Sequence, residues 1–156
     1  MTITSAICNS FKQEILVGTH NFTNSSGNTF KIALYSSNSA TLSKSTTAYT
    51  APADATADPT NTYEVTTTSS GYTGGGNTLT STTPVLSGDT ACCKFADTSW
   101  GSSASFTARG CLIYNSSASN KAVCAINFGS DKTVTSGTFT IQFPAQTAGN
   151  AIIQIA

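Results

Sequence analysis

The chain has 156 residues, of which 22 are serine and 28 are threonine. Only 9% of the residues are charged, whereas an ordinary soluble domain is roughly 25% charged. Seven acidic residues offset seven basic ones and Arg109 is the only arginine, so the chain lacks the basic cluster with which proteins bind nucleic acid or an anionic membrane.

The first predicted element is a short helix at about residues 10–17. Phe11 and Ile15 have helical spacing, Asn9 or Ser10 is placed to cap the start, and Gly18 is placed to end the segment. A strand follows at 29–35, where Phe30, Ile32 and Leu34 alternate with Lys31, Ala33 and Tyr35. This alternation predicts a half-buried strand.

Residues 36–62 carry almost no large apolar side chain, apart from Leu42 and Tyr49. A long segment of this kind inside a compact domain is unusual unless it has a function. We therefore expect an extended loop or arm that contacts a neighbouring subunit. The glycine-rich segment 71–77 that lies beyond it lacks the lysine and the helix of a phosphate-binding loop, and it predicts a flexible or bulged turn.

The remainder of the chain predicts a series of short strands. A strand at 63–67 precedes the glycine-rich segment, and further strands are expected at 84–86, 91–95, 105–114, 122–128, 137–143 and 151–155. Thr98–Gly101 is predicted to be a turn that carries the single tryptophan. Six to eight short strands at this spacing are typical of a single all-β domain, an antiparallel β-sandwich or barrel.

The cysteines and the one histidine give little support for a catalytic or metal site. The five cysteines lack C-x-x-C spacing and have no histidine nearby, so no zinc or other cofactor is expected; Cys111 and Cys124 are predicted to be buried in strands. His20 is the only residue that a Ser–His–acid triad could use, and no nucleophile motif accompanies it. The odd number of cysteines and the lack of a signal-peptide pattern favour synthesis in a reducing cytoplasm.

Large side chains in polar surroundings are the candidate partner-binding residues, since tyrosine and tryptophan join apolar area to a polar group. The candidates are Leu42, Tyr49, Tyr63, Tyr72 and Trp100. Burial beneath loops would explain the aromatic members equally well.

Several segments of the chain resemble small virion proteins of tailed bacteriophages, including cyanophages. They are residues 8–22, 29–35, 95–100, 107–115 and 137–144. The resemblance implies a non-enzymatic structural subunit on the capsid surface, a cement or decoration protein whose partners are the major capsid protein and copies of itself, often as a homotrimer. It implies no catalytic residues. The alternative is a receptor- or glycan-binding module on a tail or fibre, in which Trp100 and Tyr72 would stack on sugar rings.

Overall fold

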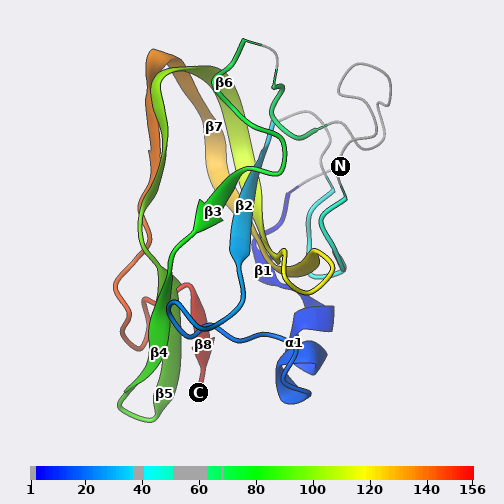
Figure 1. The fold of residues 1–156 in the computed structure, drawn as a ribbon, viewed down its shortest axis with the longest axis vertical. Helices are drawn as coiled ribbons and strands as arrows, with labels where there is room; N and C mark the ends of the chain where they lie inside the picture. Colours follow the sequence, from blue (N-terminus) through cyan, green and yellow to red (C-terminus); the bar gives the residue numbers. More distant parts are fainter. Residues whose placement is uncertain (1–2, 37–40, 51–62, 68) are drawn as a thin grey trace.

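The computed structural model describes residues 3–36, 41–50, 63–67 and 69–156. The chain folds into two antiparallel sheets and one short helix, which confirms the predicted all-β class (Figure 1). The first sheet has the strand order β1-β7-β6-β2-β3, and the second has the order β4-β5-β8. The elements are β1 (Ala6–Ile7), α1 (Asn9–Leu16), β2 (Phe30–Tyr35), β3 (Asn77–Leu79), β4 (Ser81–Ser87), β5 (Thr90–Phe95), β6 (Thr98–Asn115), β7 (Lys121–Ile141) and β8 (Ile153–Ile155).

Helix α1 lies where the sequence predicts it, but its start differs in detail. The residue before the helix is Cys8, and no side chain caps the first turn, so the predicted capping by Asn9 or Ser10 is wrong. Gly18 ends the helix with a φ of 74°, a left-handed conformation that glycine adopts at little cost. Phe11 is the buried residue of the helix, and its ring packs against His20 and Phe22.

The longest elements are β6 and β7, which pair with each other from Thr98–Ile141 to Asn115–Lys121. The predicted turn at 98–101 is therefore part of β6, and the two strands predicted at 122–128 and 137–143 are one strand. Register irregularities interrupt the pairing at several positions, and the paired ribbon bends over at the end of the molecule far from α1 (Figure 1). Bulges let a strand pass from one layer into another, so the two halves of this ribbon lie opposite each other.

Strand β2 is more deeply buried than its alternating pattern predicts. Ala33 and Tyr35 are buried as well as Ile32 and Leu34, so only Lys31 retains substantial access to solvent. The reason is that β2 lies between β6 and β3, while further chain covers its second face. Part of this cover is the segment around Glu64, whose backbone forms a bridge with Tyr35.

Residues 41–50, which lie within the predicted arm, pack against the body of the protein. The backbone N–H of Thr4 donates to Leu42 O at 2.8 Å, and the N–H of Tyr49 donates to Asn120 O at 2.8 Å. Ala48 forms an antiparallel bridge with Lys121. These backbone hydrogen bonds, together with the burial of Leu42 and Tyr49 in the core, anchor the segment. The remaining positions of the predicted arm, 37–40 and 51–62, lie outside the described residues.

The core lies between the two layers and is rich in aromatic side chains. Phe22 and Phe30 stack with ring centroids 4.3 Å apart, and Phe95 packs against both. Trp100 and Phe106 form a second aromatic group with Tyr72 and Phe139. No helix in the described part of the chain is long and apolar enough to cross a membrane.

Candidate functional site

The structure places the predicted partner-binding residues in the interior. Leu42, Tyr49, Tyr72 and Trp100 are all less than 8% exposed, and Tyr63 is partly buried. The exposure on which their binding role depended is therefore contradicted. Adjacent polar residues such as Thr50, Thr73 and Ser99 face solvent, while the rings of Tyr49, Tyr72 and Trp100 point inward.

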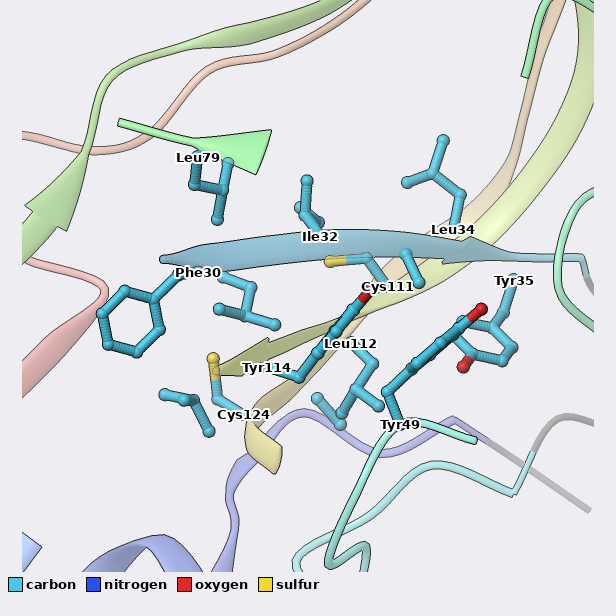
Figure 2. Close-up of a cluster of buried hydrophobic side chains, with 14 of the residues drawn as sticks. Phe30, Ile32, Leu34, Tyr35, Tyr49, Leu79, Cys111, Leu112, Tyr114 and Cys124 are labelled. Atoms are coloured by element: carbon cyan, nitrogen blue, oxygen red, sulfur yellow. The ribbon is translucent and has the colours of Figure 1, made fainter. Parts of the chain in front are cut away.

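The buried side chain of Glu64 links the segment at 41–50 to the glycine-rich segment. Its carboxylate is buried and accepts hydrogen bonds from the Tyr72 hydroxyl at 2.7 Å, the Tyr49 hydroxyl at 2.9 Å and the Gly75 backbone N–H at 2.6 Å. Tyr114 stacks on Tyr49 with ring centroids 4.4 Å apart, as Figure 2 shows. Buried carboxylates require such donors, because an unpaired charge in the interior is strongly unfavourable.

The tyrosines around Glu64 are poor proton donors to any substrate. Burial and the neighbouring Glu64 charge raise the pKa of Tyr72, Tyr49, Tyr35 and Tyr114 well above its ordinary value. The Tyr72 hydroxyl also accepts a hydrogen bond from the Leu34 N–H, and the Tyr114 hydroxyl donates to Gly75 O. This cluster therefore joins the glycine-rich loop to β2 and β6, and its role is structural.

His20 is held in a second buried polar cluster. Its Nε2 lies 2.8 Å from Glu14 Oε2, and its Nδ1 lies 3.0 Å from Asn115 Nδ2. An amide nitrogen only donates, so Nδ1 accepts and Nε2 carries the proton. Both ring nitrogens are thus occupied, and His20 has no nitrogen left to act as a catalytic base.

Glu14 completes this cluster by accepting a hydrogen bond from Lys121 Nζ at 2.7 Å. Burial acts to raise the pKa of the Glu14 carboxyl, but the hydrogen bonds from Lys121 and His20 and the charge of Lys121 outweigh burial and hold the pKa below its ordinary value. The cluster ties α1 to the start of β7. Its residues come from distant parts of the chain, so no local motif could have revealed it.

The five cysteines are buried and free, which confirms the predicted burial of Cys111 and Cys124. Burial raises the pKa of the Cys8 thiol to about 11 and that of the Cys93 thiol to about 12, with the Glu14 charge adding to the effect at Cys8. These thiols are therefore protonated and unreactive at neutral pH. Across the described residues, no group of three or more His, Cys, Asp or Glu side chains is arranged to hold a metal ion.

The feature best suited to bind a partner is an apolar cleft of about 460 Å³ between α1 and the three-stranded sheet. We call it the α1–β8 cleft. Ile15 and Phe22 line one side, and Pro84, Cys93 and Ile153 line the other. α1 and the second sheet lie at the same end of the molecule in Figure 1.

Exposed apolar side chains lie on the elements that line the α1–β8 cleft, and one of them, Ile155, is part of its lining. Among the described residues, the large hydrophobic side chains that are well exposed are Leu16, Val17, Val85, Leu86 and Ile155. Each belongs to, or directly follows, an element that lines the cleft. Leu16 is 86% exposed and Leu86 is 75% exposed. Single exposed leucines are ordinary, but exposed apolar side chains on the elements that form an apolar cleft favour a binding surface there.

Sequence reasoning missed this surface because its members come from three segments that are far apart in the chain. The only available signal was the Leu16–Val17 pair at the end of the predicted helix and the Val85–Leu86 pair in a predicted strand. No family model matches the chain, and no curated protein or solved structure matches it either.

Proposed function

We propose that this protein is a structural subunit of a phage virion, a capsid cement or decoration protein that binds the shell through the α1–β8 cleft. The observation that carries the proposal is an apolar cleft whose lining elements, α1, β4 and β8, also carry or directly precede the exposed large apolar side chains of the described residues. The resemblance of five segments to small virion proteins supplies the biological setting. The major capsid protein is the proposed partner.

The mechanism is burial of apolar area, without chemistry on a substrate. A standard protein interface buries roughly 1,600 Å² in total. An apolar side chain of the shell would enter the cleft of each copy, and Leu16, Leu86 and Ile155 of that copy would cover this side chain. Repeated over many copies that bridge neighbouring capsid subunits, these contacts would resist the pressure of packaged DNA.

The surface composition suits this setting. A shell protein is crowded against many identical copies, and zero formal net charge avoids like-charge repulsion between them. The alternative, glycan binding on a tail or fibre, depended on exposed Trp100 and Tyr72, and both are buried.

The test uses particles of the phage that encodes the chain. Mass spectrometry should find the protein in purified particles in many copies, and particles made without the gene should lose DNA at lower temperature. Recombinant protein should rebind these particles, and Leu16→Ser with Leu86→Ser should weaken that binding by at least about tenfold, because apolar burial is lost.

The matched control is Gln13→Ser, an exposed neutral position on the same helix. It should bind the particles as the unchanged protein does. The proposed function is wrong if the protein is absent from particles or present only on tails. The proposed surface is wrong if the double leucine variant, folded by circular dichroism, binds particles undiminished.

A further inference from the structure

Strand β7 has a long outer edge to which no described strand is paired. Its neighbours in the sheet are β6 and β1, and β1 pairs with it only at Ala125 and Cys124. Along residues 128–141, the described residues provide a ladder on the β6 side alone. The outer edge therefore presents backbone N–H and C=O groups that another strand could bind.

An apolar groove lies beside this edge. The bend in the β6–β7 ribbon places its two halves opposite each other, and the groove of about 460 Å³ opens between them. It is lined from one half by Cys111, Ile126 and Phe128 and from the other by Phe139 and Ile141.

The large apolar side chains that line this groove belong to the edge of the core and are only partly buried. Ile126, Phe128, Phe139 and Ile141 pack against the buried core and yet remain partly exposed. Ile152, in the segment before β8, completes the wall in the same condition. In the part of the chain that the structure describes, the sandwich is thus incompletely closed along the side that β7 forms.

Within residues 133–141, the edge lacks the side chains that usually keep a strand unpaired. These residues contain no charged residue and no proline, whereas solitary proteins protect such edges with lysine, proline or a covering loop. The nearest charges are Asp131, which faces Arg109 at 3.6 Å, and Lys132, which contacts Ser130 and contributes to the lining of the groove.

We propose that the outer edge of β7 pairs in antiparallel fashion with the same edge of a second copy, which makes a two-fold dimer. An isologous interface needs a self-complementary surface. A two-fold axis perpendicular to the sheets places the β7 edge of one copy beside the β7 edge of the other. The two apolar grooves then face each other and close into one shared core. The uncharged residues 133–141 then face one another without like charges opposite.

This inference concerns the isolated protein and is independent of the proposed function. It also differs from the trimer that the family resemblance implies. A two-fold contact occupies the β7 edge of both copies, so no free β7 edge remains for a third copy.

The test measures the mass of the full-length chain by sedimentation velocity and light scattering over about 1 to about 100 µM, since a dimer depends on concentration. We expect a concentration-dependent dimer. Ile141→Lys places a charge in the shared core and should weaken the dimer by at least about tenfold. Ile155→Lys, the same change in the exposed apolar side chain of β8, should leave the dimer unchanged.

A second set of variants avoids any risk to folding. Thr138 and Thr140 are exposed, so Thr138→Lys with Thr140→Lys should keep the fold and weaken the dimer. Single cysteines introduced at Thr133, Thr135, Thr138 and Thr140 should form an interchain disulfide only at the position near the two-fold axis. The five native cysteines are buried, so they should not compete in this reaction. Thr83→Cys, at an exposed position on β4 and so outside the β7 edge, is the control.

Three results would overturn the proposal. The chain could be monomeric throughout the concentration range, it could form a trimer, or it could form a dimer that Ile141→Lys and the lysine pair leave intact. A monomer whose lysine pair binds particles poorly would show that the shell, and not a second copy, occupies the edge.

Discussion

Glu64 shows how strongly one buried charge can organise a protein with few charges. It lies before a run of threonines and carries no motif. In the folded chain it accepts hydrogen bonds from two tyrosine hydroxyls and one backbone amide. The three donors come from the segment at 41–50 and from the glycine-rich loop, so one side chain fixes two irregular segments that lack regular secondary structure of their own.

Glu64→Gln should therefore destabilise the protein, although glutamine has the same shape as glutamate. The amide nitrogen cannot accept a hydrogen bond, so at least one buried donor loses its partner, and hydrogen bonds to charged groups contribute about 1.5–3 kcal/mol. Urea denaturation should show a loss of stability of about that size. Asp89→Asn, at an exposed turn, should change the midpoint little. Equal midpoints for the two variants would contradict the structural role of Glu64.

At this scale the sequence predicted core residues well and surface residues poorly. Strand alternation identified Phe30, Ile32 and Leu34 correctly, because burial follows a period of two. For Trp100 and Tyr72 the sequence left exposure and burial equally open, and the structure buries both. Whether a side chain in such a segment points inward depends on contacts with residues 34 and 139, which local patterns do not contain.

At the scale of the elements, the positions of most strands were predictable but their continuity was not. Gly129 and Asp131 have the composition of a turn, yet β7 runs through them because β6 pairs on both sides of the bend. The α1–β8 cleft was missed for the same reason: it is assembled from α1, β4, β5 and β8, which meet only in the folded chain.

The glycine-rich loop was predicted to be a flexible or bulged turn, and the structure shows a turn that packs tightly against β2. Gly76 has a φ of 71°, and a Cβ there would overlap with the carbonyl oxygen of Ile32. Gly88 also has a positive φ, 61°, but a Cβ there would meet open space. A substitution at Gly88 therefore tests the strain of a positive φ alone, whereas a substitution at Gly76 tests the same strain together with steric overlap.

Gly88→Ala should cost about 1–2 kcal/mol, the penalty of a left-handed conformation. Gly76→Ala should cost clearly more, since the backbone of β2 must also move. The urea midpoints of both variants measure the difference. A Gly76→Ala variant as stable as Gly88→Ala would mean that the loop yields and is not fixed on β2.

At the scale of the whole molecule, ionisable groups are few and several are buried as neutral species. Tyr35, Tyr49, Tyr72 and Tyr114 have a raised pKa because burial and the Glu64 charge disfavour their ionised forms. A group whose pKa is raised by folding contributes stability below its unfolded pKa, near 10, and this contribution is lost as the pH rises above that value.

The protein should accordingly lose stability above about pH 10, with these tyrosines ionising together as the fold is lost. Ultraviolet absorbance of tyrosinate and far-ultraviolet circular dichroism should change at the same pH. The Tyr63→Phe variant leaves these four as the only tyrosines, so its absorbance reports on them alone. Gradual ionisation near pH 10 with circular dichroism unchanged would contradict this expectation.

The bend of the β6–β7 ribbon also determines how the molecule would respond to mechanical load. At that end the two layers are joined by continuous backbone, because both strands pass from one layer to the other. At the opposite end, α1 and the second sheet face each other across the α1–β8 cleft. A force that separates the layers would therefore open them from the cleft, with the bend acting as a hinge. A partner bound in the cleft would hold this end of the molecule together. The shell would then stabilise the subunit against mechanical force, and the subunit would stabilise the neighbouring shell proteins.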